Sequence, residues 1–174
     1  MPDELQRQRL FEQCVNTHAE SMYRVAFRLT GTHDLANELV QETYLNAWAK
    51  IGSLKSPEKM RSWMFAILRN QYTKLLRGNI RLKQLAPLAE EQLAAPSLHE
   101  SESTAERVRT AIQQLDDEHK FPVLLVSMEG QSVDEAAEIL GIPKGTVLSR
   151  LHRGRAKLKT LLSREIEAYN PSST

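Results

Sequence analysis

The chain has 174 residues, which is enough for one or two small domains that each hold a modest core. Its formal net charge is only +1, glycine and proline are few, and alternating β-branched runs are absent from the sequence, so we predict an all-α fold. A single cysteine, Cys14, excludes intrachain disulfides and zinc fingers, and helical spacing places it in a core. No apolar stretch approaches the roughly 20 residues of a membrane span, and the start is too charged for a signal peptide, so we expect a cytoplasmic protein.

The sequence up to residue 78 predicts three amphipathic helices. Apolar residues recur at helical spacing in three stretches, which are separated by Thr30-Gly31-Thr32 and by the segment 52–57. Ser56 and Pro57 suit the N-cap and the first position of the third helix, which we expect to close at Arg77-Gly78. Three helices with short connections can bury their apolar stripes together, so residues 1–78 are predicted to form a helical domain.

The sequence after residue 78 predicts a linker and a second helical domain. Residues 79–102 contain two prolines and several Ala, Ser and Glu, a composition typical of a flexible tether. Residues 103–168 open with a capping box and predict a domain of four helices, followed by a tail at 169–174. Pro122 lies a turn into the second of these helices, so we expect a late or distorted start near Phe121.

The last two helices follow the plan of a helix-turn-helix that reads DNA. Ser132 and Glu135 form a capping box, Gly141 suits a left-handed helix stop, and Pro143 stands where the second helix begins. The second helix has a stripe to bury, made of Val147, Leu151, Gly154, Leu158 and Leu162. On the opposite face, at 100° per residue, lie Gly145, Ser149, His152, Arg153 and Ala156.

Positive charge is concentrated on this second helix. From Lys144 to Arg164 there are seven Lys or Arg and no acidic residue, although the whole chain is only +1. A plain solvated face is the alternative interpretation, but such segregation favours a polyanion partner. In a major groove, Arg153 can bind a guanine edge, Ser149 and His152 can reach bases or phosphates, and flanking cations can bind phosphates.

Two motifs lie on the helices described above. ELVQETYLNAW belongs to the second helix of the N-terminal domain, and GTVLSRLHRGRAKL belongs to the second helix of the helix-turn-helix. Together with most of residues 8–165 they resemble the extracytoplasmic-function (ECF) sigma factors, the small two-domain group within the sigma-70 family of bacterial RNA polymerase subunits. The resemblance implies a transcription factor that binds core RNA polymerase, recognises promoter DNA, helps to open the duplex and is commonly held inactive by an anti-sigma factor. It implies no cofactor, no metal and no catalytic residue.

The resemblance also assigns roles to particular residues. The N-terminal domain is expected to dock on the clamp coiled coil of the largest catalytic polymerase subunit and to capture and melt the −10 element. The polymerase-docking residues are Asp34, Glu38, Gln41, Glu42 and Asn46. The −10 residues are Lys55, Arg61, Trp63, Arg69, Asn70, Tyr72, Lys74 and Arg77. The −35 residues of the C-terminal domain are Lys144, Thr146, Leu148, Ser149, Arg150, His152, Arg153, Arg155 and Lys157.

Several of these residues keep a second interpretation. Trp63 and Tyr72 lie on an apolar stripe, so burial in the core is as good an account of them as DNA contact. Leu148 stands where the resembled family commonly has Lys or Arg, and it can instead touch a thymine methyl group. Gly154 replaces a usual alanine at a helix cost of about 1 kcal/mol, unless close packing on the first helix of the pair requires it.

A DNA-binding regulator and an enzyme are the two alternatives to a sigma factor. A helix-turn-helix response regulator or repressor shares the C-terminal motif, but the N-terminal half has no α/β phosphoacceptor pattern and has a basic third helix. An enzyme is disfavoured because the sequence has no glycine-rich phosphate loop, no HExxH and no cysteine with a His and Asp context.

Overall fold

The computed structural model describes residues 4–54, 56–85 and 104–169. Every regular element in this part of the chain is helical, which confirms the all-α prediction. The α-helices are α1 (Glu4–Thr30), α2 (His33–Lys50), α3 (Met60–Leu85), α4 (Thr104–Gln113), α5 (Asp117–Pro122), α6 (Val133–Leu140) and α7 (Lys144–Tyr169). The 3-10 turns η1 (Ile51–Ser53) and η2 (Pro57–Lys59) lead from α2 to α3, and a π-helix, η3 (Val123–Met128), follows α5.

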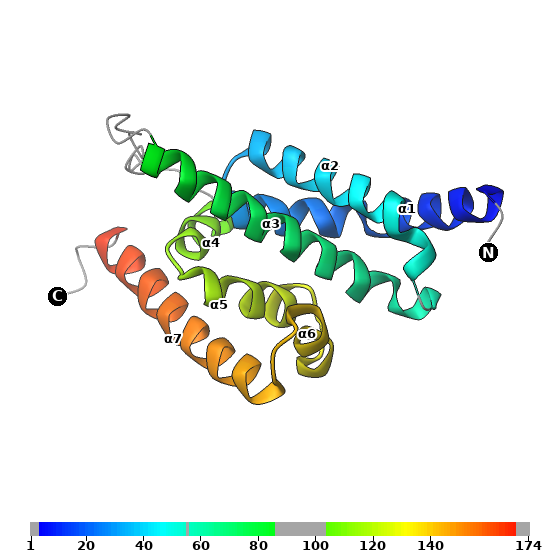
Figure 1. Cartoon of the computed structure of the whole chain (residues 1–174). Coiled ribbons are helices and arrows are strands. Elements are labelled where there is room, and N and C mark those ends of the chain that lie inside the picture. The colour runs from blue at the N-terminus through cyan, green and yellow to red at the C-terminus, as the bar shows by residue number, and fades with distance from the viewer. Residues whose placement is uncertain (1–3, 55, 86–103, 170–174) are drawn as a thin grey trace.

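Helices α1, α2 and α3 lie side by side and form the N-terminal half of the structure (Figure 1). The turn between α1 and α2 was predicted correctly. Gly31 adopts a φ of 82°, a left-handed conformation that glycine tolerates best, and Thr32 caps α2 by accepting a hydrogen bond from the Leu35 N–H at 3.4 Å.

Both ends of α3 differ from the prediction. Ser56 has the extended backbone of an N-cap but makes no side-chain capping bond, and Pro57 begins the 3-10 turn η2 rather than the α-helix. At the other end the helix continues through Gly78 to Leu85, so the stop predicted at Arg77-Gly78 is wrong. An isolated glycine lowers helix stability by only about 1 kcal/mol, and Gly78 does not adopt the left-handed φ of a helix cap.

The predicted tether and tail fall largely outside the described residues. The structure gives no account of residues 86–103 or 170–174, and the first part of the predicted linker, residues 79–85, belongs to α3.

Pro122 distorts its helix in a different place from the one predicted. The helix starts normally at Asp117, with Asp116 at the N-cap position, and contains Pro122 as its last α-helical residue. The distortion follows the proline, because residues 123–128 form the π-helix η3. Proline has no N–H to continue the α-helical bonding pattern, which accounts for a change of pattern at this point.

The helix-turn-helix is confirmed in its local details. Ser132 Oγ accepts a hydrogen bond from the Glu135 N–H at 3.1 Å, and the Ser132 N–H donates to Glu135 Oε2 at 2.7 Å, which completes the capping box. Gly141 ends α6 with a left-handed φ of 62°, and α7 begins directly after Pro143. The predicted stripe of α7 faces inward, with Val147, Leu151 and Gly154 buried.

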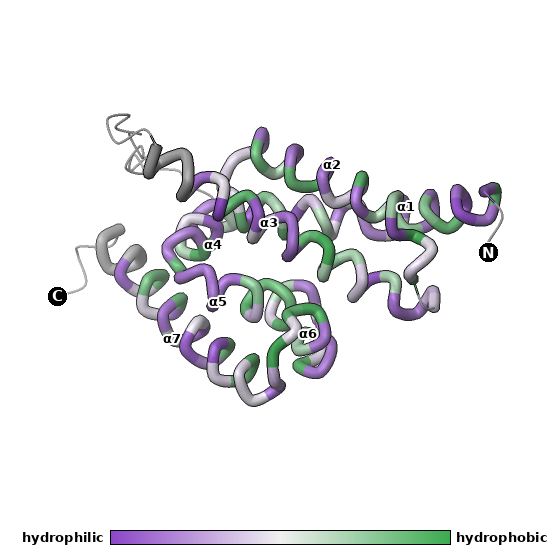
Figure 2. The backbone as a smooth tube through the Cα atoms, in the orientation of Figure 1, coloured by the Kyte–Doolittle hydropathy of each residue, from purple (hydrophilic) through white to green (hydrophobic). Residues whose placement is uncertain are grey.

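One hydrophobic core runs through both halves of the structure. It joins Phe65 and Leu68 of α3 to Leu124 and Ile139 of the C-terminal half. Figure 2 shows hydrophobic residues gathered where α5 and α6 meet, and alternating hydrophilic and hydrophobic residues along α2 and α7. Cys14 is fully buried in this core, as predicted, and burial raises the pKa of its thiol to about 11.

Candidate nucleic-acid and protein interfaces

The outward face of α7 carries the residues predicted to read bases. Ser149, His152 and Arg153 are exposed, and Leu148 keeps 47% of its surface accessible. Ser149 donates a hydrogen bond to the Thr146 carbonyl oxygen at 3.0 Å. His152 and Arg153 make no ion pair or side-chain hydrogen bond with any described residue, so both can bind a ligand without first losing a partner.

The flanking cations of α7 are held by groups of their own half. Lys144 pairs with Asp134 at 2.8 Å, Arg150 with Glu118 at 3.2 Å and Lys157 with Asp116 at 3.0 Å. The hydrogen bond from Lys157 and its charge hold the pKa of the Asp116 carboxyl below its ordinary value. Arg155 donates from Nε to Ser127 Oγ at 3.0 Å. These contacts fix cations beside the outward face, which is the arrangement that phosphate contacts on either side of a groove require.

The predicted −10 residues of α3 fall on two opposite faces of that helix. At 100° per residue, Trp63, Asn70, Lys74 and Arg77 lie within about 60° of one another. Asn70, Lys74 and Arg77 are exposed, whereas Trp63 is half-buried and packs against the core. This set is called the open face of α3 below. Lys55, which was predicted to accompany it, lies outside the described residues.

The other three predicted −10 residues form what is called here the covered face of α3: Arg61, Arg69 and Tyr72. Each contacts the C-terminal half. Arg61 Nη2 donates to the Glu129 carbonyl oxygen at 2.6 Å, and Arg69 Nη2 donates to the Leu140 carbonyl oxygen at 3.0 Å.

Tyr72 is a core residue in this structure. It is 4% exposed, and its hydroxyl donates to Asp117 Oδ1 at 3.1 Å while its ring meets Phe121 edge-on at 5.7 Å. Burial, and then the charge of Asp117 and the hydrogen bond to it, raise the pKa of Tyr72 above its ordinary value.

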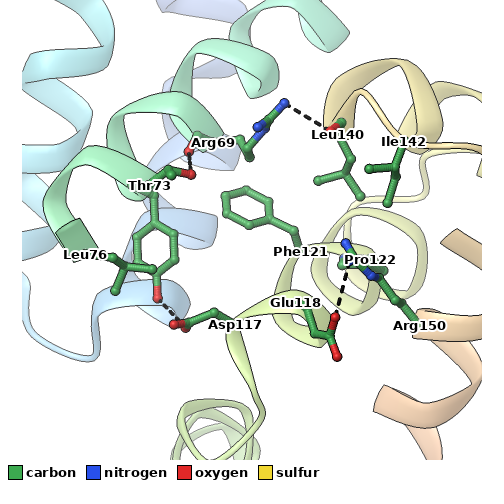
Figure 3. Close-up of a pocket in the computed structure, with 11 residues that line it drawn as sticks. Arg69, Thr73, Leu76, Asp117, Glu118, Phe121, Pro122, Leu140, Ile142 and Arg150 are labelled. Carbon is green, nitrogen blue, oxygen red and sulfur yellow. Dashed lines mark hydrogen bonds and ion pairs between the residues drawn. The ribbon is translucent and has the colours of Figure 1, made fainter. Parts of the chain in front are cut away.

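A cavity of about 210 Å³ lies beside the covered face, between α3, α5 and α6 (Figure 3). Arg69, Phe121, Leu140 and Arg150 line it, and Figure 3 shows Arg69 reaching toward Leu140 while Arg150 reaches toward Glu118. Since both guanidinium groups already have oxygen partners, the cavity is a gap at the junction of the two halves rather than a formed ligand site.

The polar face of α2 is unobstructed by the described chain. Asp34, Glu38, Gln41 and Glu42 are exposed, and the half-buried Asn46 donates to the Glu42 carbonyl oxygen at 2.8 Å. In Figure 1, α2 lies on the side of the bundle away from α7.

The prediction for α2 missed Leu45 and the exposure of Trp48. Leu45 is 63% exposed and, at 100° per residue, lies in the middle of the acidic face, because it follows Glu38 by seven positions. Trp48 is 39% exposed, with its ring edge-on to Phe11 at 5.2 Å. The helical spacing that placed the acidic residues together also identifies Leu45, so the signal was present in the sequence.

The fold and these surfaces define an all-helical DNA-binding protein that joins a helix-turn-helix reader to a second helical half with its own cationic and acidic faces. Comparison with known families agrees with this description. Residues 14–81 match sigma-70 region 2, and residues 105–158 match sigma-70 region 4.

Individual relatives support the same assignment. The chain is 34% identical over 160 residues to the ECF RNA polymerase sigma factor EcfG of Rhodopseudomonas palustris, covering 88% of this chain and 86% of that relative. It is 31% identical over 161 residues to the ECF RNA polymerase sigma factor SigE of Mycolicibacterium smegmatis, covering 88% of this chain but only 62% of SigE. The sigma factor RpoE of Bartonella quintana, solved in complex with the anti-sigma factor NepR, matches with a TM-score of 0.77 and 29% identity, over 88% of this chain and 96% of RpoE.

The chain therefore belongs to the ECF sigma factors of the sigma-70 family, non-catalytic subunits of RNA polymerase that direct transcription initiation. The predicted family and the prediction that the chain is not an enzyme are confirmed. None of the helices that the structure describes has the length and apolar character needed to cross a membrane.

Proposed function

We propose that this chain docks on core RNA polymerase through α2, reads the −35 element with the outward face of α7 and captures the −10 element with α3. On this proposal the N-terminal residues up to the end of α3 at Leu85 are the polymerase-docking and −10 domain, the residues from there to 102 the linker, and 103–169 the −35 domain, followed by a tail. The division of labour follows the two family regions that the chain matches.

The observation that carries the proposal is the distribution of partners along α7. Arg153 and His152 face outward without partners among the described residues, while Lys144, Arg150 and Lys157 are held at the flanks by carboxylates. A helix that enters a major groove needs free donors at its centre for base edges and fixed cations at its sides for phosphates.

The open face of α3 suits a single strand. Asn70 offers an amide to an unstacked base, and Lys74 and Arg77 offer charges to the phosphates on either side. These three side chains are exposed, so this part of the −10 surface is accessible in the arrangement described.

The face of α2 suits docking on a basic helix. Its carboxylates are exposed, and Leu45 supplies an apolar contact at the centre of the charged residues. An interface with an apolar centre and a polar rim gains burial energy from the centre and orientation from the charges.

Binding to bacterial core RNA polymerase, followed by transcription from a promoter library, tests the proposal. We expect the chain to bind core polymerase and to start transcription at promoters that share a two-part motif. If the chain fails to bind a cognate core polymerase but binds DNA tightly and specifically alone, the regulator alternative replaces the sigma factor.

We further propose that an anti-sigma factor controls this chain, because the similar RpoE of Bartonella quintana was solved in complex with the anti-sigma factor NepR. Co-purification of the tagged chain from its own host, with identification of stoichiometric partners, tests this. Recovery of core polymerase alone, under conditions in which the target promoters are silent, would contradict it.

A further inference from the structure

Glu129 is a buried carboxylate at the junction of the two halves. Its side chain is 1% exposed, and it stands directly after the π-helix η3. The Arg24 guanidinium donates to it twice, from Nε to Oε1 and from Nη2 to Oε2, both at 2.9 Å. Ser21 Oγ adds a third hydrogen bond at 2.7 Å. Both partners lie on α1, so this one carboxylate ties the C-terminal half to the N-terminal half.

Arg61 of α3 joins the same cluster. Its Nη2 donates to the Glu129 carbonyl oxygen at 2.6 Å and lies 3.4 Å from Glu129 Oε2. Burial raises the pKa of the Glu129 carboxyl, but the hydrogen bonds from Arg24 and Ser21 and the charges of Arg24 and Arg61 outweigh burial and hold the pKa below its ordinary value. Glu129 is therefore ionised at neutral pH. A buried charge of this kind is stable only while its partners stay in place, so the cluster specifies one arrangement of the two halves.

The π-helix accounts for the position of Glu129. The Glu129 N–H donates to the Leu124 carbonyl oxygen at 3.0 Å, a spacing of five residues instead of the four of an α-helix. Over η3 this wider winding turns Glu129 by about 100° relative to a continuous α-helix. Pro122, which directly precedes η3, is thus linked through the π-helix to the cluster on α1 and α3.

The junction hides the covered face of α3. Arg61 and Arg69 give their hydrogen bonds to carbonyl oxygens of Glu129 and Leu140, and Tyr72 donates to Asp117. Lys59 adds an exposed ion pair to Glu138 at 2.8 Å. Figure 1 shows α3 lying across α5 and α6. While the halves stay in this arrangement, Arg61 and Arg69 each keep a hydrogen bond to the C-terminal half, which a DNA phosphate would have to replace.

We propose that the Glu129 cluster is a latch that holds the free chain closed and masks the covered face of α3, and that a single DNA strand opens it by placing phosphates where the Glu129 carboxylate lies. The opening step rests on the proposed function of α3 in −10 capture. A phosphate carries the negative charge and the paired oxygens that a guanidinium group binds in a carboxylate, so Arg24 and Arg61 exchange one anion for another. Opening also frees Arg69 for the same strand.

Resonance energy transfer between the two halves tests the latch. Dyes on Asn16→Cys of α1 and Ser163→Cys of α7 use exposed positions outside the proposed interfaces, and the native Cys14 is buried. We expect Glu129→Gln and Arg24→Gln to lower the transfer efficiency while helical circular dichroism stays unchanged. Since the two substitutions break the latch from opposite halves, a folding defect in one half cannot account for both results.

Glu20→Gln is the matched control for this measurement. Glu20 also pairs with Arg24, at 3.3 Å, but its side chain is 93% exposed and both residues lie on α1. The Glu20→Gln substitution should leave the transfer efficiency unchanged. Wild-type transfer in both Glu129→Gln and Arg24→Gln would overturn the latch.

Binding of a random-sequence single strand of about 12 nucleotides tests the masking. We expect Glu129→Gln to bind the strand several-fold more tightly than the wild type. The reason is that the open, binding-competent conformation then forms without breaking the Glu129 contacts. A Lys59→Cys/Glu138→Cys variant closed with a short bismaleimide should bind it more weakly than the same variant without the linker. Equal affinity of the linked and unlinked proteins would overturn the masking.

Adding the single strand to the dye-labelled wild type tests the release. A fall in transfer with the strand bound supports displacement of Glu129, and unchanged transfer at saturation overturns it. Duplex DNA, which we propose binds the uncovered α7, should leave the transfer high. Failure of the chain to direct core polymerase would overturn the proposed function and leave the latch measurement intact, so the two failures are distinguishable.

Discussion

Gly154 of α7 lies so close to Val123 of η3 that a Cβ at position 154 would stand 2.7 Å from Val123 Cγ2. The same added atom would lie 3.3 Å from His119 Cβ of α5. From the sequence, close packing against the first helix of the helix-turn-helix was one possible reason for a glycine at position 154. Close packing is present, but the neighbours are Val123 of η3 and His119 of α5 rather than residues of α6.

This contact predicts that Gly154→Ala destabilises the protein although alanine favours helix formation. The gain in helix propensity is about 1 kcal/mol, whereas inserting a methyl group into a tight contact with a branched side chain costs about 1–3 kcal/mol. We expect a net loss of about 1–2 kcal/mol in the free energy of unfolding, measured by chemical denaturation.

Gly78→Ala is the matched control for this substitution. A Cβ at Gly78 meets nothing within 4 Å, and the residue is exposed inside α3. Its unfolding free energy should rise by up to about 1 kcal/mol. A Gly154→Ala protein as stable as Gly78→Ala would show that α7 and η3 do not pack as closely as described.

The features predicted correctly from sequence depend on neighbouring residues. The capping box of Ser132 and Glu135 and the left-handed stop at Gly141 are local signals, since each residue type suits a backbone geometry within a few positions. The buried stripe of α7 follows from a single helical period in the same way. The boundaries of the helix-turn-helix and its two faces could therefore be predicted from the sequence.

The features that were missed depend on residues far apart in the chain. Glu129 meets Arg24 across 105 positions, and no local pattern marks either residue as a partner of the other. The division of the −10 residues into two faces of α3 was readable from helical spacing, but which face the C-terminal half covers was not. The helix stop at Gly78 was predicted from glycine alone, and the continuing helix to Leu85 outweighed that weak signal.

Arg153 and Lys157 should respond differently to alanine substitution, although both are exposed cations of α7. Arg153 has no partner among the described side chains and faces outward, so Arg153→Ala is expected to cost about 1–3 kcal/mol at the −35 element and to relax preference at one base pair. Lys157 forms an ion pair with Asp116 at the flank, so Lys157→Ala should weaken binding to all DNA sequences by the same factor. Binding to −35 duplexes with single-base changes measures both. A uniform loss for Arg153→Ala would reassign it to phosphate binding.

Asn70 on the open face of α3 is predicted to act on the −10 strand. Asn70→Ala should keep polymerase binding but reduce open-complex formation or change −10 preference, measured by permanganate footprinting of unpaired thymines. Asn79→Ala is the matched control, because Asn79 is an exposed residue of the same type on the opposite side of the same helix. Equal open-complex formation in both variants and the wild type would remove Asn70 from the site.

The acidic face of α2 and its central Leu45 are predicted to bind polymerase together. Replacing Glu38 and Glu42 by Lys should raise the dissociation constant for core polymerase at least tenfold, about 1.4 kcal/mol, because cations then face the basic partner helix. Leu45→Ser should weaken binding by about 1–2 kcal/mol with little effect on folding, since this side chain is already 63% exposed in the free chain.

A charge-matched control separates docking from a general effect of charge. Glu4 and Glu12 are exposed on α1, so the Glu4→Lys/Glu12→Lys variant changes the net charge by the same amount as the α2 variant at a different surface. Titration of labelled chain with core polymerase gives the affinities, and circular dichroism checks the helical fold. If both charge variants lose the same affinity, the effect is long-range electrostatics. If Glu38→Lys/Glu42→Lys and Leu45→Ser bind normally, polymerase docks on a face other than that of α2.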